Sequence, residues 1–173
     1  MRTQISPLLI IVTGLPGTGK TFFARALAEK ISARHFNTDI IRDALGLRGR
    51  YDETSKQQVY QEMEQQTASA LKSGERVVVD GTFFKKKLRA AYQRLGGKFG
   101  TQVHWIVVEA PEEIVRQRVS QKREYSEADF GVYLKIREAW EPLGAPHLTL
   151  RSEQLSHMLE KALDHLHLQN NNA

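Results

Sequence analysis

A glycine-rich motif, Gly-Leu-Pro-Gly-Thr-Gly-Lys-Thr, occupies residues 14–21 of the chain. The apolar run Leu8 to Val12 precedes it, and a helical pattern starts at Lys20. Strand, loop and helix therefore follow one another as they do around a phosphate-binding loop. Its glycines let the backbone curl so that consecutive N–H groups point at phosphate oxygens, and the helix N-terminus adds partial positive charge. The motif predicts a nucleoside triphosphate site; the alternative is a glycine-rich turn that binds nothing.

Two side chains of this motif have specific expected roles. Lys20 reaches the β- and γ-phosphates, and the hydroxyl of Thr21 ligates magnesium. ATP and Mg²⁺ are therefore the expected cofactors. The remaining predicted nucleotide-binding residues are Gly14, Leu15, Pro16, Gly17, Thr18 and Gly19.

Length and composition favour one globular domain. The chain has 173 residues, of which 40% are hydrophobic and 26% are charged. This composition predicts a single domain over residues 1–168 and a disordered tail over 169–173. Cysteine is absent, which excludes disulfides, thiolate metal sites and cysteine nucleophiles.

Localisation and partners are less constrained by composition. The start of the chain lacks the pattern of a signal peptide, and the first apolar run is too short to span a bilayer, so the interpretation is a cytoplasmic protein without a membrane partner. The net charge of +5 suits either nucleic-acid binding or an enzyme that closes around polyphosphate. The oligomeric state stays open.

Apolar runs alternate with helical patterns along the chain. Strands are predicted at residues 8–13, 34–37, 76–80, 103–108 and 148–150. Helices are predicted at residues 20–32, 40–45, 55–73, 85–95, 112–121, 127–140 and 152–168, with the fourth ending at a glycine pair and the last capped by Ser152. This alternation predicts an α/β fold of the three-layer P-loop NTPase type (nucleoside-kinase-like), with a central parallel five-stranded sheet, helices on both faces and a small lid around residues 116–128.

Ligands of such sheets bind at the carboxyl ends of the strands, where Asp39 follows the second predicted strand. Arg42 comes three residues later, so on a helical turn both side chains point the same way. Asp39 is a candidate base that accepts the proton of an attacking hydroxyl, and Arg42 a candidate contact for the acceptor or the transferring phosphate. In the alternative, Asp39 only caps the helix at residues 40–45 and Arg42 is its surface partner.

Asp80 ends the third predicted strand, after Val77, Val78 and Val79. A carboxylate at this place holds magnesium, directly or through water, in nucleotide-binding folds of this kind. The alternative role is a cap for the turn at Gly81. We favour the magnesium site, because a buried strand delivers its terminal carboxylate to the nucleotide pocket.

Two basic clusters follow. The first cluster consists of Arg116, Arg118, Lys122 and Arg123. It predicts a mobile lid whose arginines, foremost Arg118 and Arg123, stabilise negative charge on the triphosphate. The alternative is a solvent-exposed helix end whose basic side chains suit the helix dipole. Residues 85–87 with Arg89 form a second cluster, either an acceptor or nucleic-acid patch or a solvated surface. The six histidines lack the spacing of metal ligands.

The ordered series of motifs resembles the P-loop kinase group of AAA-labelled predicted kinases and zeta-toxin-like kinases, related to polynucleotide kinase, chloramphenicol phosphotransferase and gluconate kinase. The resemblance rests on residues 14–21, 38–46, 79–83, 109–112, 126–129 and 140–143. It implies that Asp39 is the general base, that Arg42 contacts the acceptor, and that Arg118 or Arg123 is a lid arginine. The chain departs from the group's pattern at Arg151-Ser152, where an Asp-Thr or Asp-Ser pair is expected.

The function hypothesis is therefore an ATP-dependent phosphotransferase. It moves the γ-phosphoryl group to a hydroxyl acceptor, foremost a small molecule, with a nucleic-acid 5′ end as a further acceptor class. Two alternatives are an ATP-binding switch that acts through a partner, and a nucleic-acid-binding module regulated by ATP. Neither the acceptor nor a regulatory partner can be named from the sequence, because family likeness constrains the reaction better than the substrate.

Overall fold

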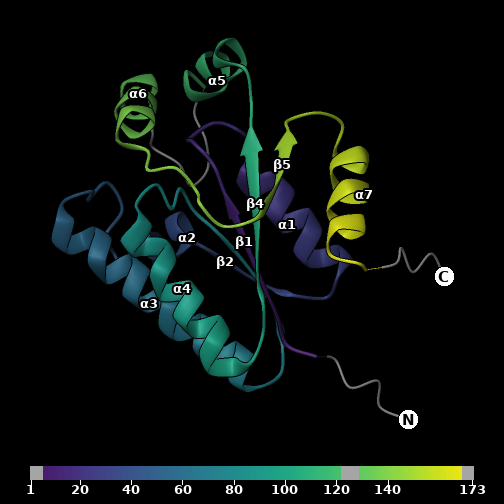
Figure 1. The fold of residues 1–173 in the computed structure, drawn as a ribbon. Coiled ribbons are helices and arrows are strands. Elements are labelled where there is room, and N and C mark those ends of the chain that lie inside the picture. The colour runs from purple at the N-terminus through teal and green to yellow at the C-terminus, as the bar shows by residue number, and fades with distance from the viewer. Residues whose placement is uncertain (1–5, 122–128, 169–173) are drawn as a thin grey trace.

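A parallel sheet runs through the centre of the computed structural model, which describes residues 6–121 and 129–168 (Figure 1). Its five strands have the order β2-β3-β1-β4-β5, and all neighbours pair in parallel. The strands are β1 (Leu8–Thr13), β2 (Arg34–Asn37), β3 (Arg76–Asp80), β4 (Val103–Glu109) and β5 (His147–Arg151). Each lies within a residue of its predicted place.

Helices cover both faces of this sheet, so the predicted three-layer α/β fold is confirmed. They are α1 (Lys20–Lys30), α2 (Thr38–Ala44), α3 (Glu53–Lys72), α4 (Lys86–Phe99), α5 (Glu112–Val119), α6 (Phe130–Ala139) and α7 (Leu155–His165). α1 and α7 cover one face, and α3 and α4 cover the other (Figure 1). α5 and α6 lie beyond the carboxyl ends of the strands, at the top of Figure 1. Within the described ranges, no helix combines the length and apolar character that a membrane span needs.

The central strand shows why the sheet is covered on both sides. Leu9 and Ile11 are fully buried in the cluster beneath α3 and α4, whereas Ile10 and Val12 are fully buried in the cluster beneath α1 and α7. Successive side chains of a strand point to opposite faces, so an unbroken apolar run needs a cover on each. The two cores pack the sheet from both sides, and the motifs predicted to carry chemistry follow the strands at its carboxyl edge.

The predicted end of α4 at Gly96-Gly97 is wrong, because the helix continues to Phe99 and ends at Gly100, which has φ 63°. Gly96 does not end the helix but allows α4 to pack closely against the segment that leads into β4. A Cβ at Gly96 would lie 2.6 Å from Cγ2 of Val103 and 2.8 Å from the carbonyl oxygen of Thr101. A glycine is therefore needed here because α4 approaches the start of β4 closely.

Other helix ends differ from the prediction for local reasons. α2 begins at Thr38, with Asn37 as its cap, so Asp39 is not the cap. α3 begins two residues early, because Asp52 accepts a hydrogen bond from the backbone N–H of Ser55. α7 begins at Leu155 and not at Ser152, which is engaged elsewhere. The first part of the predicted helix at 127–140, part of the predicted lid, and the tail at 169–173 lie outside the described residues.

Candidate active site

The phosphate-binding loop joins β1 to α1 and is shaped by its glycines. Gly17 and Gly19 have φ values of 78° and 91°, a region that side chains with a Cβ rarely adopt. A Cβ at Gly14 would lie 2.4 Å from the carbonyl oxygen of Val108, on the neighbouring strand β4. Gly19, the residue before α1, has no side chain and so provides no side-chain cap for the start of that helix. The loop is thus a backbone cradle for an anion.

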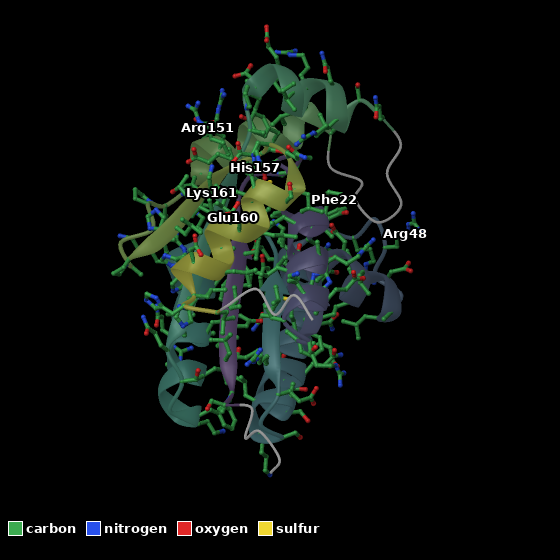
Figure 2. The ribbon with its side chains drawn as sticks, turned by 90° about the vertical axis from the view of Figure 1, so that its right-hand side faces the viewer. Phe22, Arg48, Arg151, His157, Glu160 and Lys161 are labelled. Carbon is green, nitrogen blue, oxygen red and sulfur yellow. The ribbon has the colours of Figure 1, made fainter. Side chains whose placement is uncertain are left out.

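The side chains of this loop fold back onto it. The Thr18 hydroxyl donates a hydrogen bond to the carbonyl oxygen of Leu15 at 2.9 Å, and the Lys20 ammonium donates to the same oxygen at 3.4 Å. The Lys20 charge therefore lies beside the cradle. Phe22 follows on the first turn of α1 with 68% of its surface exposed, on the face of the molecule that α1 and α7 form (Figure 2).

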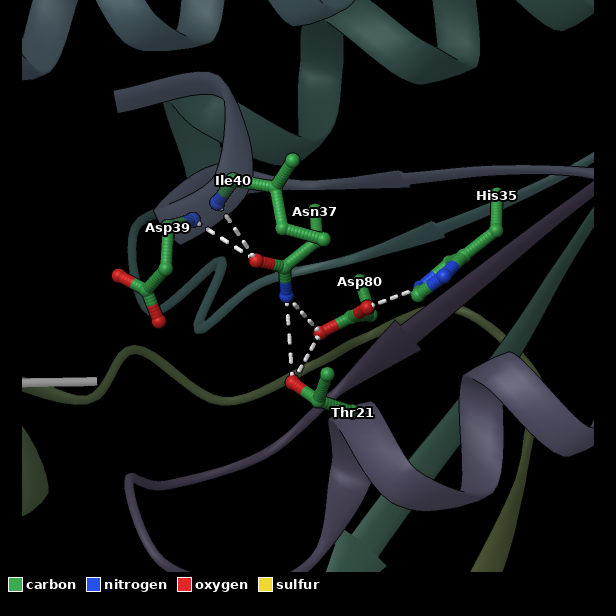
Figure 3. A network of polar contacts seen from close by, with 6 residues as sticks. All are labelled: Thr21, His35, Asn37, Asp39, Ile40 and Asp80. Carbon is green, nitrogen blue, oxygen red and sulfur yellow. Dashed lines mark hydrogen bonds and ion pairs between the residues drawn. The ribbon is translucent and has the colours of Figure 1, made fainter. Parts of the chain in front are cut away.

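Thr21 and Asp80, the predicted magnesium ligands, are in direct contact. The Thr21 hydroxyl donates to Oδ1 of Asp80 at 2.8 Å, across the junction of α1 and β3 (Figure 3). Asp80 is completely buried, and its other oxygen, Oδ2, is hydrogen-bonded to Nε2 of His35. A hydroxyl and a carboxylate are hard oxygen ligands of the type that Mg²⁺ prefers. The donor set therefore fits magnesium at the edge of the phosphate loop.

Asn37 joins this pair to helix α2. Its Nδ2 donates to Oδ1 of Asp80 at 2.7 Å and to the Thr21 hydroxyl at 3.2 Å. Its Oδ1 accepts the backbone N–H groups of Asp39 and Ile40 at 2.9 and 3.0 Å. Figure 3 shows these contacts as one chain of hydrogen bonds from His35 to the first turn of α2. The structure thus places the predicted magnesium ligands and the predicted base on either side of one amide.

Asp39 and Arg42 form an ion pair on α2. The Arg42 Nη1 donates to Oδ1 of Asp39 at 2.9 Å, and the side chain of Arg42 is only 8% exposed. The guanidinium of Arg42 also lies over the ring of Tyr51, with 4.5 Å between its Cζ atom and the ring centroid. The buried Nε of Arg42 has no hydrogen-bond partner. A buried guanidinium of this kind has residual capacity for a polar or anionic group.

Tyr60 of α3 lies within electrostatic range of the Asp39–Arg42 pair. Burial raises the pKa of its hydroxyl, although hydrogen bonds with Thr82 and with the backbone of Phe83 act in the opposite direction. Its ring packs edge-on against Phe83 with centroids 5.4 Å apart. Phe83 has φ 45° and is fully buried, which is unusual for an aromatic residue. The turn after β3 therefore holds a strained backbone beside the predicted acceptor region.

Arg118 of α5 reaches the phosphate loop. It donates to the carbonyl oxygen of Gly17 at 3.3 Å and to the hydroxyl of Ser152 at 3.0 Å. Ser152 follows β5, so this arginine connects α5, the loop and the end of the last strand. Arg123 lies outside the described residues. Arg116 turns away, with its Cζ atom 3.9 Å from the ring centroid of Phe130 on α6.

The second basic cluster is divided by burial: Lys86 and Lys87 are exposed, whereas Arg89 is buried and cannot be part of a surface patch. Arg89 is 5% exposed and donates to the carbonyl oxygens of Phe84, Glu141 and Pro142. Burial accordingly lowers the pKa of Arg89. Its role is to fasten the segment after α6 to the segment before α4. Elsewhere in the described residues, no group of three or more histidines or acids could hold a metal ion.

The sequence of residues 9–143 matches the family described as AAA domain, AAA_33. The chain belongs to this AAA domain family. It is also 30% identical over 123 residues to uncharacterized proteins of Mycobacterium tuberculosis and Mycobacterium bovis, a match that covers 64% of this chain. The chain spans only about a quarter of the length of those relatives.

Solved structures resemble this AAA domain in fold. A sugar kinase from Janibacter sp. HTCC2649 has a TM-score of 0.74 and 17% identity, covering 95% of this chain and 96% of that chain. The APS kinase CysC of Mycobacterium tuberculosis, in complex with AMPPNP and APS, has a TM-score of 0.72 and 16% identity, covering 94% and 99%. A gluconokinase from Sinorhizobium meliloti has a TM-score of 0.68 and 17% identity, covering 93% and 92%. The AAA domain thus has the P-loop kinase fold.

Three residues of this AAA domain were missed as site residues by sequence reasoning. His35 and Asn37 lie on the short edge strand β2, and Ser152 was assigned to a helix cap. Asn37 did carry a local signal, since asparagine before a helical pattern is a strong N-cap. The contacts of His35 and Asn37 with Asp80 span 45 and 43 residues of sequence and depend on the pairing of β2 with β3.

Proposed function

We propose that this chain is a kinase that transfers the γ-phosphoryl group of ATP to a hydroxyl of a small molecule. The observation that supports it most is the link through Asn37, which sets the Thr21–Asp80 pair on one side and the Asp39–Arg42 pair on the other. A phosphoryl donor and a hydroxyl acceptor need such adjacent sites. The sugar kinase, gluconokinase and APS kinase of the same fold suggest a small-molecule acceptor.

On the donor side, each described residue has a defined task. The loop N–H groups and Lys20 bind the phosphates, and Arg118 fixes the loop from α5. Thr21 and Asp80 would hold Mg²⁺, Asp80 directly or through water. When bound, Mg²⁺ neutralises negative charge on the β- and γ-phosphates. Arg123 is proposed as a second arginine on the triphosphate.

On the acceptor side, Asp39 receives the proton of the attacking hydroxyl. The acceptor oxygen forms a bond to the γ-phosphorus while the bond from that phosphorus to the β–γ bridging oxygen breaks, and ADP leaves. Arg42 orients Asp39 through their ion pair and offers its partner-free Nε to the acceptor. Catalysis then consists of positioning and charge neutralisation.

The test is transfer from γ-labelled ATP with Mg²⁺ to pooled acceptors: sugars, sugar acids, aminosugars, nucleosides and 5′-hydroxyl oligonucleotides. We expect label in one small-molecule class. Label on the oligonucleotides would move the assignment to a nucleic-acid end. Hydrolysis of ATP without transfer to any acceptor would contradict the kinase and favour a switch that acts through a partner.

A further inference from the structure

The amide of Asn37 is occupied at both ends, and its partners allow only one orientation. Two backbone N–H groups of α2 face its oxygen, and the carboxylate of Asp80 faces its nitrogen. The flipped amide would set two N–H donors against the amide nitrogen and a carboxylate against the amide oxygen. Asn37 therefore makes four hydrogen bonds that an aspartate, a serine or an aliphatic side chain could not make together.

The position of this amide is fixed by the sheet. Asn37 pairs with Asp80 in the parallel register of β2 and β3, so the two side chains leave adjacent strands at the same edge. Asn37 is 3% exposed and Asp80 is fully buried, so water cannot replace a broken bond at low cost. The link is consequently stiff.

We propose that Asn37 is a positioning residue that fixes α2, and with it Asp39, relative to the Thr21–Asp80 pair. This inference rests on the proposed function. α2 spans only Thr38–Ala44, and Asp39 is its second residue. The backbone N–H group of Asp39 itself donates to the side-chain oxygen of Asn37. A displacement of the first turn therefore displaces the candidate base, and misplacement by about 1 Å can lower a rate by roughly a hundredfold.

The Thr21 hydroxyl is oriented by the same amide. It accepts from Nδ2 of Asn37 and donates its proton to Asp80, which leaves its second lone pair for a metal ion. Asn37 thus acts on both sides of the transferring group. Binding of a nucleotide at the phosphate loop should therefore change the stability of the first turn of α2 through the hydrogen bonds of this amide.

The competing interpretation is that Asn37 only caps α2. Serine caps helices about as well as asparagine, so a cap alone would survive Asn37→Ser. The serine hydroxyl stops near the place of the asparagine Cγ atom and cannot also span the gap to Asp80. Asn37→Ala removes the cap and the link together. The serine and alanine variants therefore separate the two roles.

The experiment compares wild type, Asn37→Ser and Asn37→Ala, using the acceptor labelled most strongly in the pooled assay. We expect Asn37→Ser to keep a KM for ATP within about twofold while kcat falls by about tenfold to a hundredfold. Its Tm should fall through the lost bonds to Asp80 and Thr21, and Asn37→Ala, which also loses the cap, should show the same loss of kcat with a lower Tm still. The matched control is Asp52→Ser, which exchanges the cap of α3, a carboxylate that contacts Ser55 and Arg50, and should leave kcat within about twofold.

Hydrogen exchange supplies a readout that a cap alone would not change. Binding of Mg²⁺ and AMPPNP should slow exchange of the backbone N–H groups of Asp39 and Ile40 in wild type and not in Asn37→Ser. Wild-type kcat and wild-type exchange behaviour in Asn37→Ser would overturn the inference and leave the kinase standing. Absence of transfer by the wild-type protein would overturn both, and the wild-type assay distinguishes that failure from the first.

Discussion

The proposed donor side and the proposed acceptor side of the candidate site lie at the same edge of the sheet, but they differ in how far backbone groups and side chains form them. The donor side is mainly backbone, shaped by Gly14, Gly17 and Gly19 within one short motif. The acceptor side is made of side chains such as Arg42 and Tyr60, which come from separate helices. The backbone of the loop excludes a Cβ at these three glycines, whereas side chains on separate helices can vary with the acceptor. On the proposed assignment, this difference would let one reaction serve many substrates in a single fold.

The largest expected effect comes from Gly14, because its neighbour is backbone. Gly14→Ala would place a Cβ 2.4 Å from the carbonyl oxygen of Val108, so the loop or β4 must move. We expect kcat/KM for ATP to fall by about a hundredfold or more. The control is Gly144→Ala, since nothing lies within 4 Å of a Cβ at that position. Steady-state kinetics at varied ATP provides the measurement, and normal kinetics in Gly14→Ala would contradict a backbone-built donor side.

Arg42 tests the acceptor side. Arg42→Ala removes a charged hydrogen bond to Asp39, so kcat/KM for the acceptor should fall by about tenfold to a hundredfold. Arg42→Lys keeps the charge but loses the planar contact with Tyr51 and should recover only part of the loss. Nucleotide affinity, measured by calorimetry with Mg²⁺ and AMPPNP, should stay unchanged in both variants. A parallel loss of nucleotide affinity would show that the two sides are not separate.

Arg118 should give a smaller effect on the donor side. Arg118→Ala breaks hydrogen bonds to Gly17 and Ser152, and we expect AMPPNP to bind about fivefold to tenfold more weakly. Arg116→Ala is the matched control, because that arginine stacks on Phe130 and is largely exposed. Equal affinities of the two variants would remove Arg118 from the nucleotide site.

The smallest expected effect on activity comes from the glycine pair in α4, because Gly96 lies against Val103 at the start of β4, at the opposite edge of the sheet from the candidate site. Gly96→Ala would clash with Val103 and Thr101 and should lower the free energy of unfolding by about 1–3 kcal/mol. Gly97→Ala meets nothing within 4 Å and should raise it by about 1 kcal/mol through helix propensity. Chemical denaturation of both variants measures this, and kcat should be unchanged. Equal stabilities would contradict the packing role of Gly96.

The sequence was most informative where structure depends on local pattern. The strands and the phosphate loop were predicted because apolar runs and glycine spacing act over a few residues. The end of α4 was predicted wrongly at Gly96, because a single sequence does not distinguish a glycine that ends a helix from a glycine that permits close packing. The partners of Asp80 could not be predicted, because His35 and Asn37 reach it only through the register of β2 and β3. Ser152 was assigned to a cap because its contact with Arg118 joins segments 34 residues apart.

The most direct test of this account is Asp39→Asn, which keeps the shape of the side chain and removes its capacity to take a proton. Transfer from γ-labelled ATP in a single turnover and affinity for Mg²⁺ with AMPPNP would be measured on the same preparations. The account predicts that transfer falls by about a hundredfold to ten-thousandfold while affinity stays within about twofold. Transfer at the wild-type rate in Asp39→Asn would contradict the assignment of Asp39 as the base and, with it, the division into donor and acceptor sides.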